Sequence, residues 1–296
     1  MIEIKVPATS ANLGPGFDSI GMALELYNYV KIDKSDKLQI FSAIPEIPKD
    51  GSNLIYKTMM GFYDIIGKKP DTSFIIKQED NIPLTRGLGS SAACTVAGVL
   101  AADYFSGAHL SKKELAYIAA EIEGHPDNST PALVGGVVVG VMSPGALDYI
   151  KLEIKGQDKL KFAVMVPGFE LPTEKARGIL PKEYNIKDVV FNVSRAALLV
   201  AALSSGDFDC LGEAMSDRLH QVYRANIINN MDDIFKEASR LGAKASFLSG
   251  AGPTLISVVT DDEFFGKMAL YLNTLEDVWN IRNIKIDQHG AVLMSC

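Results

Sequence analysis

The segment Pro83-Leu84-Thr85-Arg86-Gly87-Leu88-Gly89-Ser90-Ser91-Ala92-Ala93 places two glycines and two serines at the start of a run of small residues. Glycine can adopt a positive φ angle and lets a ligand approach the backbone closely. Residues 90–105 contain hardly a charge, so we expect them to form a buried, closely packed helix. The first turn of a helix has unpaired N–H groups and a partial positive charge. The segment therefore predicts a binding site for an anion such as phosphate.

This segment differs from the common phosphate-binding motifs. The P-loop pattern G-x-x-x-x-G-K-[ST] is absent, no lysine lies in the loop, and the glycines do not follow G-x-G-x-x-G. The alternative is an ordinary glycine turn with a serine as helix N-cap, which needs only one residue of each kind. Two glycines, two serines and a small-residue helix exceed that need.

The overall composition excludes several classes of protein. Of the 296 residues 47% are hydrophobic, which supports a sizeable core in two compact domains or one large one. The net charge of −7 disfavours binding to nucleic acids or to anionic membranes. An odd number of cysteines (Cys94, Cys210 and Cys296), none at C-x-x-C spacing, indicates neither a disulfide framework nor a structural zinc site. With no signal region and no apolar run of about 18 residues, we expect a cytoplasmic protein.

Strand-like and helix-like segments alternate along the chain, which predicts a mixed protein of helices and sheets. Strands are expected at 2–6 (ended by Pro7), 24–34, 73–77, 133–142, 161–166, 245–248, 255–259, 284–286 and 291–294. Helices are expected at 53–66, 90–105, 111–123, 189–203, 231–241 and 263–272. Pro, Gly and charged residues gather between 143 and 157, where we place a domain boundary.

Two further segments are rich in glycine. The first, Pro7-Ala-Thr-Ser-Ala-Asn-Leu-Gly-Pro-Gly-Phe-Asp18, reads by itself as a long turn with side-chain hydrogen bonds. The second, Ser249-Gly-Ala-Gly-Pro-Thr254, joins two expected strands and reads by itself as a hairpin loop.

Together the three segments resemble the motifs of the small-molecule kinase superfamily that includes galactokinase, homoserine kinase, mevalonate kinase and phosphomevalonate kinase. They match in order and span almost the whole chain. The amino-acid sequence of residues 7–18 and that of the turn Glu123-Gly-His-Pro-Asp-Asn128 are most similar to the homoserine kinase branch. The resemblance implies phosphorylation of the L-homoserine side-chain hydroxyl by ATP and Mg²⁺, on the route to threonine. It also implies an α+β fold of two domains. Residues 1–155 would form an ATP-binding domain with a left-handed βαβ unit, and residues 156–296 a ferredoxin-like domain.

The resemblance assigns the nucleotide and the metal to particular residues. Residues 83–93 would cradle the ATP phosphates with N–H groups in place of a lysine, and Asn53 would lie near the adenine. Asn53 is explained equally well as a helix N-cap, and Arg86 either adds charge to the phosphate site or is a solvated loop residue. Ser91 and a glutamate would hold Mg²⁺. Glu121 and Glu123 both qualify, and helical geometry favours Glu123, since it lies beside the apolar face of its helix.

For the amino-acid substrate, the resemblance implies contacts from Asn12, Asp18, His125, Thr173, Arg177 and Arg224. Guanidinium groups bind a carboxylate through two parallel hydrogen bonds, which suits Arg177 and Arg224. Asp18 suits the ammonium group and could also contact the hydroxyl. Arg218 is an alternative to Arg224. The other three histidines (His109, His220 and His289) lie in polar segments and are expected at the surface.

The catalytic base is not evident from the sequence. Relatives in the superfamily use an aspartate where this chain has Asn128, which cannot accept a proton as a carboxylate does. Asp127 is adjacent, but neighbouring residues at a helix start point about 100° apart. We therefore predict transfer without a dedicated protein base, in which Asn128 orients the hydroxyl and phosphate or water takes the proton.

Two alternatives remain at this point. One is another kinase of the superfamily, acting on mevalonate or a sugar; such substrates carry no α-ammonium group for Asp18. The other is a non-catalytic ligand-binding member, which would be expected to lose the phosphate-loop glycines or the metal ligands. A homodimer is compatible with the resemblance and with the apolar composition, but the sequence does not determine the oligomeric state.

Overall fold

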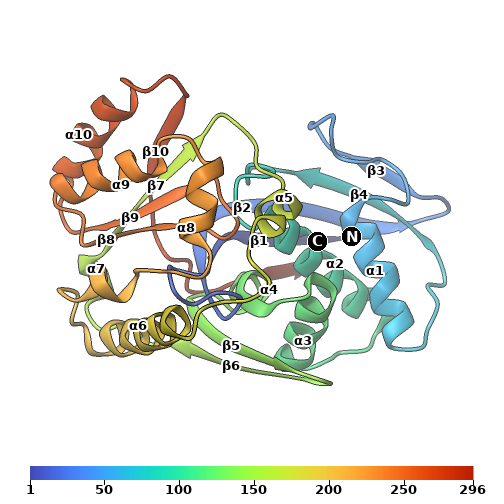
Figure 1. Ribbon diagram of the computed structural model, residues 1–296. Helices are drawn as coiled ribbons and strands as arrows, with labels where there is room; N and C mark the ends of the chain where they lie inside the picture. The colour runs from blue at the N-terminus through green and yellow to red at the C-terminus, as the bar shows by residue number, and fades with distance from the viewer. Residues whose placement is uncertain (296) are drawn as a thin grey trace.

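The computed structural model describes residues 1–295 and contains two β-sheets with helices packed on them (Figure 1). Cys296, one of the three cysteines considered above, lies outside the described residues. The larger sheet has the order β11-β1-β2-β4-β3, and a hairpin of β5 and β6 is attached to β2. Its strands are β1 (Ile2–Ala11), β2 (Ile20–Ser35), β3 (Gln39–Phe41), β4 (Ser73–Glu79), β5 (Val137–Ser143), β6 (Ala146–Leu152) and β11 (Val292–Ser295).

One pair of strands in this sheet is parallel and the other pairs are antiparallel. β3 and β4 run parallel, and α1 (Leu54–Ile65) connects them. Parallel neighbours require such a crossover connection. The pair with its helix is a βαβ unit, as the resemblance implies for this half.

Helices α2 (Ser90–Ser106) and α4 (Pro126–Val134) pack against β1 and β2, and α3 (Lys112–Glu123) packs on both of these helices. The three helices supply several residues of the site described below. As predicted, α2 is buried along most of its length. α4 comes very close to β2, because a Cβ atom at Gly21 would lie 1.6 Å from the carbonyl oxygen of Asp127. The absence of a side chain at Gly21 therefore sets where the first turn of α4 can lie.

The smaller sheet has four antiparallel strands in the order β10-β7-β9-β8. They are β7 (Lys161–Pro167), β8 (Ala245–Leu248), β9 (Leu255–Val259) and β10 (Trp279–Ile284). Numbered along the chain this order is 4-1-3-2, and α9 (Met231–Arg240) and α10 (Glu263–Leu272) pack on the strands. The expected ferredoxin-like arrangement of this half is confirmed. Between β7 and β8 lie α5 (Thr173–Gly178), α6 (Ile186–Ser205), α7 (Leu211–Ala214) and α8 (Gln221–Arg224).

Several expected elements are wrong in detail. The first strand does not end at Pro7; it continues to Ala11, and the register with β2 shifts between Pro7 and Ala8. Proline lacks an N–H group, and such an irregularity lets a strand accommodate it. The polar stretch after residue 143 contains β6, which is largely exposed and so lacks an apolar pattern. The helix start considered near Asp127 extends into a full helix, α4, which runs to Val134 and takes the first residues of the strand expected at 133–142. Proline at the first helical position, here Pro126, is favourable.

The last strand of the chain returns to the first sheet. β11 pairs antiparallel with β1, with Ile2 opposite Ser295, so the two ends of the chain lie together (Figure 1).

The division of the chain into two domains at residues 155 and 156 stays a prediction. Within residues 1–295, no helix has the length and apolar character that crossing a membrane requires.

Candidate active site

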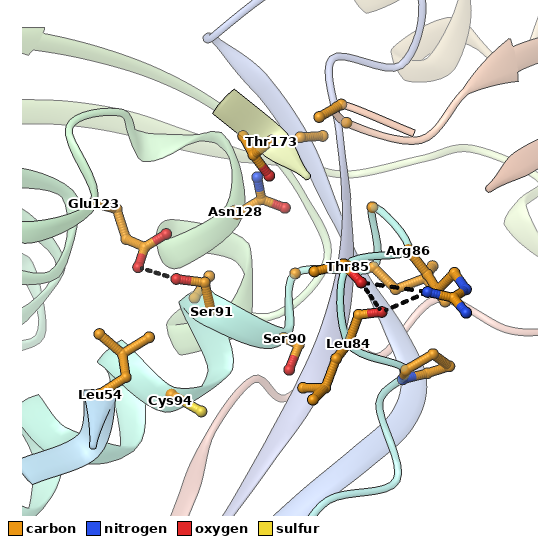
Figure 2. A pocket seen from close by; sticks show the side chains of 18 of the residues that line it. Leu54, Leu84, Thr85, Arg86, Ser90, Ser91, Cys94, Glu123, Asn128 and Thr173 are labelled. Carbon is orange, nitrogen blue, oxygen red and sulfur yellow. Dashed lines mark hydrogen bonds between the residues drawn. The ribbon is translucent and has the colours of Figure 1, made fainter. Parts of the chain in front are cut away.

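A cavity of about 360 Å³ brings the three glycine-rich segments together. Most of the residues predicted for the site line it: Asn12, Asp18, Asn53, residues 83–92, Glu123, Asp127, Asn128, Thr173, Arg177 and Arg224. Figure 2 shows side chains that line this cavity and labels several of them, from Leu54 to Thr173. Ala93 is buried inside the protein and does not line the cavity, and His125 reaches the site only through its contact with Asp127. The lining also includes residues that the sequence did not single out, among them Phe17, Gln78 and Gly250.

A serine hydroxyl joins the three segments to one another. Ser249 Oγ lies 2.6 Å from the carbonyl oxygen of Gly87 and 2.8 Å from Ser10 Oγ. Because a carbonyl oxygen can only accept, the Ser249 hydroxyl donates to Gly87, and Ser10 is then able to donate to Ser249. Asn12 adds a hydrogen bond from its Nδ2 to the carbonyl oxygen of Gly250, 3.1 Å long. The hairpin loop 249–254 is therefore part of the site wall.

The start of α2 depends on a glycine. Gly89 is the N-cap residue, with φ of 69°, and a Cβ atom there would lie 1.9 Å from Thr9 Oγ1. That hydroxyl donates a hydrogen bond of 2.7 Å to Asn128 Oδ1. The absence of a side chain at Gly89 thus lets the end of the loop 83–89 and the first turn of α4 pack against the same residue, Thr9.

We expect Gly89→Ala to destabilise the protein more than Gly107→Ala. Gly107 is the C-cap of the same helix, with φ of 64°, and a Cβ atom there has nothing within 4 Å. Both substitutions cost about 1 kcal/mol for the left-handed conformation, and Gly89→Ala adds about 1–3 kcal/mol of steric overlap with Thr9. Urea unfolding measures both losses. Equal losses for the two variants would contradict the close packing at Thr9.

Glu123 faces two hydroxyl groups of α2. Its Oε1 accepts hydrogen bonds from Ser91 Oγ at 3.0 Å and from Thr95 Oγ1 at 2.6 Å (Figure 2 draws the first). Glu121, the other candidate, is exposed. A carboxylate with neighbouring hydroxyl oxygens is the donor set that a magnesium ion prefers, so these residues fit the ion. Thr95 was not predicted, although its position four residues after Ser91 places it on the same helix face.

Arg86 is tied to the backbone of neighbouring segments. Its Nε donates to the carbonyl oxygen of Pro167 at 3.0 Å and its Nη2 to that of Gly168 at 2.7 Å. Its Nη1 donates to the carbonyl oxygen of Leu84 and lies 3.4 Å from Glu170. These contacts connect the loop 83–89 to the end of β7, so Arg86 is not the solvated loop residue of the second alternative. A contribution of its charge to a phosphate site stays a prediction.

Asn53 uses its side chain at the start of α1. Its Oδ1 accepts from the N–H groups of Ile55 and Tyr56, and its Nδ2 donates to Gln78 Oε1 at 2.7 Å and to the carbonyl oxygen of Pro48. The N-cap interpretation is therefore confirmed, and both polar atoms of the side chain have partners within the protein. Asn53 still lines the cavity, so it shapes the wall beside a bound ligand.

Asp18 and Arg177 form a bidentate ion pair in the cavity wall. Arg177 Nη2 and Nη1 lie 2.7 Å and 3.1 Å from the two carboxylate oxygens. The hydrogen bonds to Asp18 raise the pKa of Arg177 although burial opposes the shift. Both this guanidinium and that of Arg224 face the ring of Phe17, at 5.7 Å and 5.5 Å. The site thus presents two positive groups and one negative group side by side.

Arg224 is buried, with 1% of its surface exposed. Its Nε donates to the carbonyl oxygen of Ala176 at 3.1 Å and its Nη1 to that of Gly250 at 2.9 Å. Burial, followed by the charge of Arg177, lowers the pKa of Arg224 to about 10, so it is still charged at neutral pH. Arg218, the alternative considered from the sequence, is exposed and pairs with Asp188 instead.

His125 and Asp127 are paired at the start of α4. His125 Nδ1 lies 2.5 Å from Asp127 Oδ1, and Asp127 is 3% exposed. Burial by itself would lower the pKa of His125, but the hydrogen bond and the charge of Asp127 outweigh it and raise this pKa. Asn128 accepts from Thr9 through Oδ1, and its Nδ2 is then the group able to donate toward a ligand.

The expectation that His220 lies at the surface is wrong. His109 and His289 are exposed, whereas His220 is 0% exposed. Its segment is polar because the carboxylate of Asp217 accepts hydrogen bonds from the N–H groups of Leu219, His220 and Gln221, just before α8 and at its first residue. Sequence polarity alone suggests exposure, whereas here the polar groups satisfy one another inside the protein.

The chain is similar to known proteins over its whole length. The model for the N-terminal domain of GHMP kinases matches residues 53–136, and the model for their C-terminal domain matches residues 199–267. Homoserine kinase from Caldicellulosiruptor saccharolyticus is 46% identical over 100% of this chain and 97% of its own length. Homoserine kinase from Clostridium botulinum is 43% identical over 100% of this chain and 99% of its own. The crystal structure of homoserine kinase from Cytophaga hutchinsonii superposes with a TM-score of 0.86 at 29% identity, covering 99% of this chain and 97% of that one.

Proposed function

The chain belongs to the homoserine kinases of the GHMP kinase family, and on this basis we propose that it transfers the γ-phosphoryl group of ATP to the side-chain hydroxyl of L-homoserine. The product is O-phospho-L-homoserine, an intermediate of threonine biosynthesis. The observation that carries the proposal is the cavity itself. It combines the N-terminus of α2 and Glu123 with two arginines and Asp18. Such a site can hold a polyphosphate and a small zwitterion together.

The polyphosphate part of the proposal rests on α2. The unpaired N–H groups of its first turn and the helix dipole favour negative charge, which supports binding of the phosphates by residues 83–92. A magnesium ion held by Ser91 and Glu123 would neutralise charge that develops on the transferred group. Thr95 keeps the carboxylate of Glu123 turned toward Ser91.

The amino-acid part rests on the charges beside Phe17. The fork of Arg177 and Nη2 of Arg224 suit the carboxylate of homoserine, and Asp18 suits its ammonium group. In this structure Asp18 and Arg177 neutralise each other. When a zwitterion binds, its carboxylate can pair with Arg177 and its ammonium group with Asp18 in place of this ion pair. Asn12, His125 and Thr173 remain proposed further contacts.

Proton removal from the hydroxyl is proposed to need no protein base. The carboxylate of Asp127 is engaged with His125, which reduces its availability as a base. We expect Asp127→Asn to lower kcat by less than about tenfold, whereas a general base contributes about 10²–10⁴-fold. Steady-state kinetics with L-homoserine measures this. A decrease of about 10³-fold with unchanged homoserine binding would contradict the proposal and identify Asp127 as the base.

The function is tested by a coupled assay of ADP release with ATP and Mg²⁺. The panel is L-homoserine, L-threonine, L-serine, mevalonate and galactose. Turnover confined largely to L-homoserine is expected. Turnover with mevalonate or galactose instead would be consistent with the proposed phosphate site but would contradict the proposed amino-acid pocket. If folded protein that still binds ATP releases no ADP with any of the five compounds, the result would favour a non-catalytic ligand-binding protein.

A cytoplasmic location and a homodimer also stay predictions. Ile186, Val190 and Val193 are exposed apolar residues spaced along α6, a pattern that supports association of two copies. Sedimentation velocity of the purified chain measures the oligomeric state directly.

A further inference from the structure

A buried histidine contacts two parts of the candidate site that are far apart in the sequence. His220 Nε2 lies 2.7 Å from the carbonyl oxygen of Gly14, in the first glycine-rich segment. On the other side of the ring, His220 Nδ1 lies 3.1 Å from Nη1 of Arg224. The imidazole therefore sits between the loop that carries Asp18 and the arginine proposed for the substrate carboxylate.

These two contacts determine the tautomer of the ring. The carbonyl oxygen of Gly14 can only accept, so Nε2 carries the hydrogen. The guanidinium of Arg224 can only donate, so Nδ1 is the unprotonated nitrogen. Burial lowers the pKa of His220, in keeping with a neutral ring. A neutral histidine with its hydrogen on Nε2 satisfies both neighbours, and no other protonation state does.

The imidazole is held in place from several directions. Asp217 accepts the N–H of His220 at 2.9 Å and itself accepts a hydrogen bond from Asn192 Nδ2 at 2.6 Å. The ring of Phe17 stacks on the imidazole, with 5.2 Å between the centroids. A fixed ring presents its Nδ1 lone pair in a fixed direction.

We propose that His220 is a positioning residue that orients the guanidinium of Arg224 toward the substrate carboxylate; this inference rests on the proposed function. The contacts to Ala176, Gly250 and His220 engage Nε and Nη1 of Arg224. Nη2 is then the nitrogen that can meet a carboxylate in the cavity that Arg224 lines. Because His220 also holds Gly14, it couples the position of Arg224 to the loop that carries Asp18.

Two substitutions separate the two hydrogen bonds of the ring. The amide oxygen of His220→Asn can take the place of Nδ1 and accept from Arg224, but this side chain is too short to reach Gly14. The amide nitrogen of His220→Gln can take the place of Nε2 and donate to Gly14, but Arg224 loses its acceptor. Each variant loses one buried hydrogen bond, so the two should be destabilised to a similar extent.

We expect His220→Gln to raise KM for L-homoserine about tenfold, with little change in KM for ATP, because a hydrogen bond to a charged group is lost. His220→Asn is expected to keep KM for L-homoserine near that of the wild type. His289→Gln, a change at an exposed histidine, is the control and should leave the kinetics unchanged. Equal KM values for the Gln and Asn variants would overturn the proposal and reduce His220 to a packing residue.

An NMR measurement on the unmodified protein tests the same contact without relying on activity. Nitrogen chemical shifts of the His220 ring should show a proton on Nε2 and none on Nδ1. A proton on Nδ1 would overturn the proposal even if neither variant folds. If the wild type shows this tautomer but does not phosphorylate L-homoserine, the proposed function fails while the contact to Arg224 stands.

Discussion

Glu123→Gln is expected to lower kcat by about 10²–10³-fold while leaving KM for L-homoserine little changed. Glutamine keeps the shape of the side chain and can still accept from Ser91 or Thr95, so the packing between α2 and α3 survives. It lacks the negative charge that a magnesium ion requires from its protein ligand. Steady-state kinetics over a range of Mg²⁺ concentrations measures the effect, and the Mg²⁺ concentration needed for half-maximal rate should rise.

Glu121→Gln is the matched control for this prediction. Glu121 lies on the same helix, two residues earlier, and is exposed. It should therefore leave kcat and the Mg²⁺ dependence unchanged. A loss of activity in Glu121→Gln equal to that in Glu123→Gln would contradict the assignment of the metal to the cavity between Ser91 and Glu123.

Arg224→Met is expected to raise KM for L-homoserine by about 10²–10³-fold, because removing one partner of a buried charged pair costs about 2–5 kcal/mol. The methionine fills most of the same volume but donates no hydrogen bond. It also leaves the carbonyl oxygens of Ala176 and Gly250 without this donor, so some loss of stability is expected. Kinetics with varied homoserine, together with a thermal unfolding curve, separates lost binding from lost folding.

Two further variants make this result specific. Arg218→Met removes an exposed arginine six residues earlier, which pairs with Asp188, and should leave KM within the error of the wild type. Arg224→Lys keeps a charge but not the planar fork, so its KM should lie between those of the wild type and Arg224→Met. An unchanged KM in a folded Arg224→Met protein would show that Arg224 does not bind the substrate.

Much of the fold could be predicted from local patterns. Asn53 and Ser111 cap the helices that follow them, and the helix at residues 90–105 is buried as its small residues indicate. The extent of the helix at 126–134 and the strand at 146–152 were missed for different reasons. The first contains two prolines, one of them at a favourable first position, and the second is largely exposed and so lacks an apolar pattern.

For the site, the three glycine-rich segments could be recognised, but the hydrogen bonds between them could not. Ser249 and Gly87 are 162 residues apart and their contact depends on how two sheets pack together. His220 was misjudged for the same reason: it lies in a polar stretch that suggests solvent, yet it meets Gly14 and Arg224. The contacts of Arg86 with the carbonyl oxygens at the end of β7 depend on the same packing.

The sequence by itself determined the class of the protein, its order of glycine-rich segments and the residue types available for phosphate, magnesium and an amino acid. These properties depend on local conformation and on side-chain chemistry, which neighbouring residues control. Only the tertiary structure decided which polar groups bind one another, such as Asp18 with Arg177 and His220 with Arg224. A buried polar group must find a partner when water is removed, and that partner can come from any part of the chain that packing brings near.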